Sequence, residues 1–162
     1  MPAGLRAHAL AAKGLHVFMD KQVQVAKLDA VLANQGKLTD EYRVKLQALA
    51  STLAGATATS SNDWLQALTT LNKFGANTGN IDQYAEAVKN LAGMMEGGIP
   101  EAAFIFGKAM QGQHHMLTRY GIEVDSTKSR TEQLAQIMQQ AATAVLAQAN
   151  TSQQTVLKLL QG

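Results

Sequence analysis

The sequence predicts an all-α protein, an irregular multi-helix bundle or array of about six to eight short helices. Alanine makes up roughly a sixth of the chain, and alanine has the lowest free-energy cost of any residue in a helix. Apolar residues recur at steps of three and four, which is the spacing of one helix face. Glycine-rich stops separate these stretches by two to eight residues, and such short connections indicate antiparallel neighbouring helices.

The first helix is predicted over residues 5–34. Gly14 is expected to divide it in two, because glycine in a helix interior costs nearly 1 kcal/mol relative to alanine. Gly36 ends it, since glycine suits the left-handed position after a helix. This stop predicts two parts, an N-terminal helical segment of residues 1–36 and a helical module of residues 37–162. One continuous domain is the alternative. One face of this helix carries Val17, Phe18, Val25, Leu28, Val31 and Leu32.

The second and third helices begin at hydroxyl residues. Thr39 is a natural N-cap for the second, and the acidic residues that follow it favour the positive end of the helix dipole. Ser60 or Ser61 opens the third helix, which ends at Phe74 and Gly75. We expect the single Trp64 to anchor the core.

The fourth and fifth helices lie on either side of Gly97-Gly98. Asn80 and Gln83 resemble a capping box before the fourth helix, which Gly97-Gly98 is expected to stop. Pro100 suits the first turn of the fifth helix, where a missing N–H costs nothing. Gly112 ends the fifth helix.

The last third of the chain begins with a short helix near residues 114–120. Residues 122–125 alternate apolar and polar side chains and are compatible with an extended strand, although no partner strand is evident. Ser129 and Glu132 form the clearest capping box in the sequence. Thr151 and Gln154 are expected to start a separate, final short helix.

No catalytic, cofactor-binding or metal-binding residue is assigned. The chain has no cysteine, which excludes disulfides and thiolate ligands. None of the four histidines stands four residues from another, as metal-binding helices require, and adjacent His114 and His115 point about 100° apart. Most acidic residues lie at predicted helix starts, and neither a glycine-rich phosphate loop nor a Gly-x-Ser-x-Gly elbow occurs. The sequence therefore indicates binding or assembly rather than catalysis.

Charge and hydropathy narrow the class of partner. Net charge is +2, and lysine and arginine are scattered singly rather than gathered in the dense stripe that is typical of nucleic-acid binders. No apolar run approaches the roughly 20 residues that span a membrane. Residues 1–19 lack acids, but Lys13 and His16 interrupt any apolar stretch, so no targeting peptide is expected.

Two stretches, residues 71–93 and 102–122, carry a distinctive order of helical elements. In the first, a leucine-rich helix ends in a Phe-Gly turn and is followed by a helix with a Leu-Ala pair near its end. The second is an Ala-Ala-x-x-x-Gly-Lys-Ala helix, a glycine stop, and a Leu-x-Arg-x-Gly-Ile element. Together these elements resemble the helical segment of bacteriophage and prophage tail tape-measure proteins, and the resemblance covers about residues 27–140. The residues that carry it, or are expected to pack, are Trp64, Leu68, Phe74, Gly75, Tyr84, Leu91, Phe106, Gly107, Gly112, Leu117, Arg119, Gly121 and Ile122.

The resemblance implies a non-enzymatic structural role in tail assembly, located in the virion tail and in the host bacterial cytoplasm during assembly. The expected partners are tail-tube or tail-tip proteins, with self-association possible and neither a small-molecule substrate nor a cofactor. Even as one helix the chain would span only about 240 Å, so it is expected to be a fragment or remnant that carries one module. The alternative is a DNA-associated or regulatory domain, in which Arg119, Lys128 and Arg130 would contact phosphates. A small lytic hydrolase is a third reading and lacks paired acids.

Overall fold

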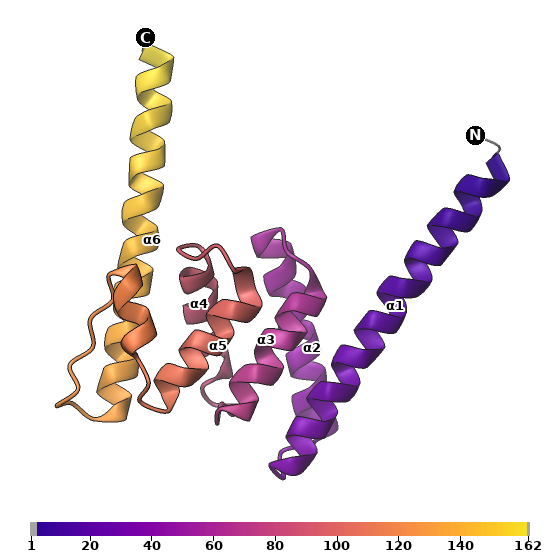
Figure 1. Ribbon diagram of the computed structural model, residues 1–162, viewed down its shortest axis with the longest axis horizontal. Coiled ribbons are helices and arrows are strands. Elements are labelled where there is room, and N and C mark those ends of the chain that lie inside the picture. The colour runs from indigo at the N-terminus through magenta and orange to yellow at the C-terminus, as the bar shows by residue number, and fades with distance from the viewer. Residues whose placement is uncertain (1–2, 162) are drawn as a thin grey trace. The chain divides into compact units, whose positions relative to one another are not determined.

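The computed structural model describes the backbone of residues 3–161 and the side chains of residues 11–147 and 157–161. This part of the chain is all-helical, as the sequence predicts, with six α-helices, one 3-10 helix and no strand (Figure 1). The helices form two compact units, Met1–Thr69 and Thr70–Gly162. The connection at Gly36, which the sequence suggests as a boundary, lies inside the first unit.

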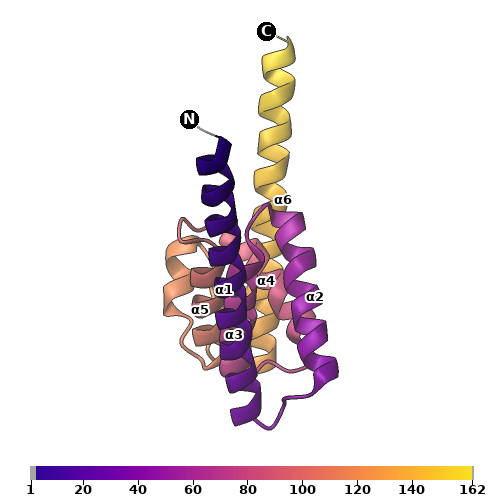
Figure 2. The same cartoon turned by 90° about the vertical axis from the view of Figure 1, so that its right-hand side faces the viewer.

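The first unit contains α1 (Ala3–Asn34), α2 (Asp40–Thr57) and most of α3 (Ser61–Lys73). Helices α1 and α2 lie side by side (Figures 1 and 2), and Arg43 of α2 donates a 3.0 Å hydrogen bond to Asp29 of α1. This bond raises the pKa of Arg43, with help from the nearby charge of Asp29. The fully buried side chains among the described residues of this unit are Leu28, Leu32, Leu46, Ala50, Trp64, Leu65, Ala67 and Leu68.

Helix α1 runs unbroken through Gly14, so the predicted division at this residue is wrong. Nothing lies within 4 Å of the position where a Gly14 side chain would begin. The only cost of glycine here is therefore its conformational entropy, nearly 1 kcal/mol, which a 32-residue helix can carry.

The predicted start signals of α2 and α3 are confirmed. The Thr39 hydroxyl accepts a hydrogen bond from the Tyr42 N–H at 3.1 Å, and the Ser60 hydroxyl accepts one from the Asp63 N–H at 3.0 Å. Each bond satisfies a backbone donor that the first helical turn leaves free. The end of α2 departs from the glycine rule, because Ala58 occupies the left-handed position there, with a φ of 52°.

The second unit contains the end of α3, then α4 (Ile81–Ala92), α5 (Gly98–Met110), a 3-10 helix η1 (His115–Tyr120) and α6 (Arg130–Gln161). Helices α4, α5 and α6 pack against one another. The core of these helices and η1 includes Ile81, Ala85, Val88, Leu91, Ala102, Ala103, Ile105, Phe106, Ala109, Leu117, Ile137 and Ala141.

Two predictions about α4 are wrong. Asn80 makes no side-chain cap, because its Oδ1 atom accepts instead from the Asn77 N–H at 2.8 Å and closes the preceding turn. Helix α4 ends at Ala92, and Gly97-Gly98 begins α5 rather than stopping α4. Gly98 fits this start because its φ is +73°.

The C-terminal predictions are partly corrected. The Ser129–Glu132 capping box opens α6 as expected. Residues 122–125 form no strand, and α6 continues as one helix to Gln161, so no separate final helix begins at Thr151. The side chains of Thr151 and Gln154 lie outside the described residues, and the backbone around them is continuous helix.

Candidate functional site

The two stretches that carry the tape-measure resemblance meet in the second unit. The ring of Phe74, which follows α3, lies against the backbone of Gly107 in α5. A Cβ atom on Gly107 would stand 2.7 Å from Cε2 of this ring and closer still to its Cδ2. Gly107 is therefore needed for close packing and not for a turn.

An aromatic contact and a backbone hydrogen bond hold Phe74 against α5. Phe74 meets Phe104 edge-on, with 6.1 Å between ring centroids, and the Lys108 ammonium lies 5.4 Å from the Phe104 centroid. The Gln111 side-chain amide donates a 2.9 Å hydrogen bond to the Phe74 carbonyl. These contacts tie the turn after α3 to one side of α5.

Gly112 and Gly121 occur where the backbone turns. Both have positive φ angles, +89° and +77°, which side chains other than glycine rarely adopt. Gly112 also leaves room for the Arg130 guanidinium, which donates to the Met110 carbonyl at 3.3 Å. After Gly121, the Ile122 N–H bonds to the Leu117 carbonyl at 3.2 Å and its side chain enters the core.

The predicted motif and packing residues do not gather at one site. Trp64 and Leu68 lie in the core of the first unit, where the Trp64 indole donates to the Thr57 hydroxyl at 3.1 Å. The others belong to the second unit, where Leu91, Phe106 and Leu117 are buried, Phe74 and Tyr84 are half-buried, and Gly75, Arg119 and Gly121 are exposed. The rings of Tyr84 and Phe106 lie 5.2 Å apart. The buried and half-buried members of this set serve packing, and its glycines serve turns or close contacts.

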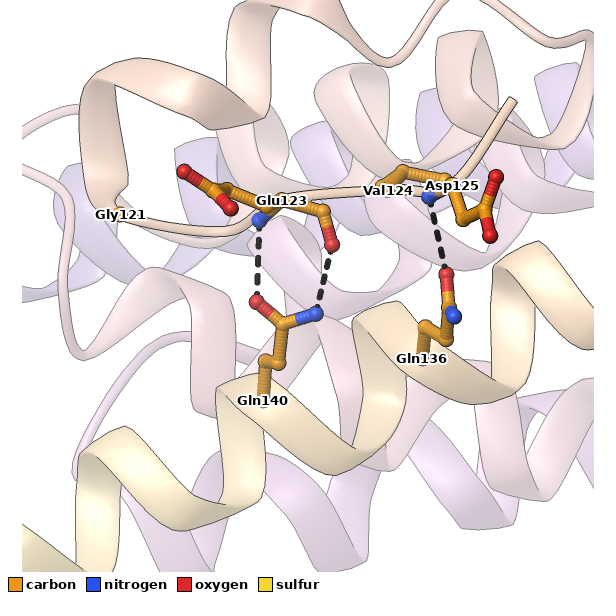
Figure 3. A pocket seen from close by; sticks show the side chains of 6 residues that line it. All are labelled: Gly121, Glu123, Val124, Asp125, Gln136 and Gln140. Atoms are coloured by element: carbon orange, nitrogen blue, oxygen red, sulfur yellow. Dashed lines mark hydrogen bonds between the residues drawn. The ribbon is translucent and has the colours of Figure 1, made fainter. Parts of the chain in front are cut away.

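A polar hollow lies between the segment after Gly121 and α6 (Figure 3). The Gln140 amide accepts from the Glu123 N–H at 2.9 Å and donates to the Glu123 carbonyl at 2.6 Å. One turn earlier, Gln136 accepts from the Asp125 N–H at 3.1 Å. The two glutamines thus replace a partner strand for the backbone of this segment, so the backbone groups of Glu123 and Asp125 that face the hollow of about 510 Å³ are already bonded.

The carboxylates near this hollow serve local turns. Asp125 accepts from the Thr127 hydroxyl at 2.6 Å and from its N–H at 3.0 Å, and these bonds lower the Asp125 pKa. Bonds from the Ser129 N–H and hydroxyl lower the pKa of Glu132 in the same way. Both acids are therefore ionised at neutral pH and are poor proton donors.

The histidines do not assemble into a metal site in the described part of the chain. No group of three histidine, cysteine or acidic side chains there is placed to hold an ion. His114 is half-buried, and His16 and His115 are exposed. The side chain of His8 lies outside the described residues.

A groove of about 470 Å³ between α1 and α2 is the candidate site of the first unit. Val25 and Ala26 form an apolar floor, and Lys21 and Asp29 supply opposite charges. Although Asp29 binds Arg43 through Oδ2, its other oxygen, Oδ1, is buried and has no hydrogen-bond partner among the described groups. We call this the α1–α2 groove, and it is lined by Phe18, Lys21, Gln22, Val25, Ala26, Asp29 and Gln47.

Next to this groove, α1 exposes large apolar side chains. Sequence patterning places Val17 and Phe18 on the face that buries Leu28 and Leu32, yet they are 59% and 57% exposed. The reason is length: α1 has 32 residues and α2 has 18, so α2 cannot cover the whole of α1. The signal in the sequence is the length of residues 5–34, because one unbroken helix of that length extends beyond the 18 residues of α2.

No family model matches the chain, and neither a curated protein nor a solved structure matches it significantly. The likeness to tape-measure proteins therefore rests on the sequence pattern alone. None of the helices in the described residues is long and apolar enough to cross a membrane.

Proposed function

We propose that the chain is a non-enzymatic assembly module of a bacteriophage or prophage tail, which contacts tail-tube or tail-tip proteins through α1. The observation that carries this proposal is the exposure of Val17 and Phe18 on the face of α1 that buries Leu28 and Leu32. Burying an apolar side chain stabilises a contact by about 25 cal/mol per Å², so an uncovered apolar face favours a protein partner.

The α1–α2 groove indicates the chemistry of that partner. Phe18 and Val25 favour an apolar side chain, the partly exposed carboxylate of Asp29 favours a positively charged or hydrogen-bond-donating group, and Lys21 favours an acceptor. An amphipathic helix that carries a lysine, arginine or amide near an apolar residue meets these demands. The assignment to a phage tail comes from the sequence resemblance. The proposed location, the virion tail and the host cytoplasm during assembly, rests on the same resemblance.

Binding to defined tail proteins tests the proposal. The genes beside this reading frame are expected to encode tail-tube and tail-tip proteins, and these are the binding partners to purify. Phe18→Glu places a charge on the exposed face and is expected to weaken binding at least tenfold. Val44→Glu is the matched control, because Val44 is 64% exposed on α2 and does not line the groove.

Either of two outcomes contradicts the proposal. One is a reading frame that stands alone among metabolic or regulatory genes. The other is binding to tail proteins that Phe18→Glu and Val44→Glu reduce equally, because the effect would then come from added charge and not from the α1 face.

A DNA-associated or regulatory domain is the second candidate, favoured by the exposed Arg119 and Lys128 in the second unit. Arg130 contributes less than the sequence suggests, because its guanidinium packs on Gly112 and binds the Met110 carbonyl. Asp125 also offsets part of the charge of Lys128. Phosphate contacts predict DNA binding that weakens steeply with salt, whereas the assembly proposal predicts no specific binding at 150 mM salt.

A further inference from the structure

One side of α1 carries a heptad pattern that the fold of its own unit does not use. Apolar residues recur there at alternating steps of four and three, and such a seam sustained over three heptads is typical of a coiled coil. The one polar member is His16, and the sequence continues the pattern toward the N-terminus with Ala9 and Leu5. We call this the α1 seam, and its described members are Ala12, His16, Met19, Val23, Ala26, Ala30 and Ala33.

The seam faces away from the core of its unit. Every described member is exposed, including Met19 at 54% and Val23 at 50%. The buried Leu28 stands two residues from both Ala26 and Ala30, which is about 200° around the helix. The seam therefore stays exposed even where α1 packs on α2, and it differs from the face that contains Val17 and Phe18.

The size of the seam residues suits a close helix partner. Four of the seven are alanine, which allows two helix axes to approach near the lower end of the usual 8–10 Å range. Met19 and Val23 lie together between these alanines and supply the large apolar contacts. From residue 12 to residue 33 the seam is about 32 Å long, at 1.5 Å per residue.

Charges along one edge of the seam decide whether two α1 helices would pair in a parallel or an antiparallel direction. Asp20 and Lys27 lie on the same edge, seven residues apart. In a parallel pair this edge meets the opposite edge, which places Asp20 beside Leu15 and Lys27 beside Gln22, without an ion pair. In an antiparallel pair like edges meet, so that Asp20 faces Lys27 of the second copy, and the same ion pair forms twice.

We propose that the α1 seam binds the α1 seam of a second copy of this chain, antiparallel, about a two-fold axis between residues 24 and 25. Val23 then meets Ala26 of the second copy, and Met19 meets Ala30. Two-fold pairing uses the same surface on both chains, which is the commonest form of self-association. This inference goes beyond the proposed function, because it concerns a second copy. Of the residues that line the α1–α2 groove, only Ala26 also belongs to the seam, so Phe18, Val25 and Asp29 remain for another protein.

Disulfide cross-linking of the full chain tests the pairing, and the absence of native cysteine makes each result specific. Met19→Cys and Ala30→Cys are prepared separately and then mixed under oxidising conditions. We expect a mixed covalent dimer and little cross-linking of either variant alone, because identical positions lie about 16 Å apart in the antiparallel pair. Cross-linking of each variant with itself would indicate a parallel pair and would overturn the proposal.

Sedimentation equilibrium of the full chain measures the affinity. Val23→Glu is expected to raise the dimer dissociation constant at least tenfold, whereas Val44→Glu leaves it unchanged, because Val44 is also exposed, at 64%, but lies on α2. Asp20→Lys weakens the dimer, and adding Lys27→Asp to the same chain restores it. A chain that is monomeric up to 100 μM, or a double variant that is no better than Asp20→Lys, would overturn the proposal. Circular dichroism of each variant confirms that it has folded.

Discussion

At the residue scale, glycines that the resemblance singles out have different physical roles. Gly112 and Gly121 provide positive φ angles, whereas Gly107 has helical geometry and provides space for the Phe74 ring. The sequence predicts the first role, because a glycine at a helix end is a familiar signal. The second requires knowing which ring crosses the helix, and only the tertiary structure supplies that.

Gly107→Ala should therefore destabilise the second unit. Overpacking of a close contact costs roughly 1–3 kcal/mol, and this exceeds the gain of nearly 1 kcal/mol that alanine brings to a helix interior. Urea unfolding followed by circular dichroism measures the change. Gly55→Ala is the matched control, because Gly55 lies inside α2 with nothing within 4 Å of the added atom, and it should stabilise the chain. A Gly107→Ala protein as stable as the unmodified chain would contradict the packing role.

Because of Asp125 and Glu132, the folded chain should become less stable in acid. Hydrogen bonds from Thr127 and Ser129 lower their pKa values in the folded chain below those in the unfolded chain. Their contribution is therefore complete above the unfolded pKa and is lost as the pH falls through the folded pKa. From pH 7 to pH 2, the melting temperature of the double variant Asp125→Asn/Glu132→Gln should fall less than that of the unmodified chain. Glu41→Gln controls for the change in charge, and identical pH profiles for all variants would contradict the assignment.

At the element scale, local signals predict helix starts better than helix ends. Thr39 and Ser129 cap their helices as expected because the cap is made within one turn, whereas Asn80 is diverted to a neighbouring turn. The alternation in residues 122–125 is typical of a strand, but its backbone bonds are made by glutamine side chains of α6. No local pattern reveals such a partner, which comes from eleven to seventeen residues away.

Gln140→Leu should release the segment after Gly121. It removes both hydrogen bonds to the Glu123 backbone, so the amide of Glu123 should exchange hydrogen for deuterium at least tenfold faster. Gln139→Leu is the matched control, because Gln139 is an exposed neighbour on the same helix that lies outside the hollow. Equal exchange at Glu123 in both variants would show that the Gln140 side chain does not hold this segment.

Helix α1 offers a test of its continuity. Gly14→Ala removes the entropic cost of glycine without any contact to disturb, so helical signal should rise and stability should increase by about 0.5–1 kcal/mol. Circular dichroism during thermal unfolding measures both quantities. If α1 were divided at Gly14, alanine would disturb a turn, and the signal would stay the same or fall.

At the scale of the whole molecule, composition and periodicity are sufficient to predict an all-helical chain, and Trp64 and Leu68 are correctly placed in a core. The sequence predicts the two candidate surfaces of α1 less well. Phe18 belongs by pattern to a buried face and is exposed because α2 ends too early, and the α1 seam becomes evident only when Leu28 shows which side is buried. Exposure depends on which neighbour covers a residue, and periodicity does not encode this.

We propose that this chain works in a phage tail through protein contacts. Mass spectrometry of tails, purified by density gradient from host cells that carry the gene, tests it most directly. We predict that peptides of the chain co-fractionate with the tail-tube protein, and that Phe18→Glu shifts them to the soluble fraction whereas Val44→Glu does not. Peptides found only in a soluble or DNA-bound fraction, with tails of normal length and composition, would contradict the claim.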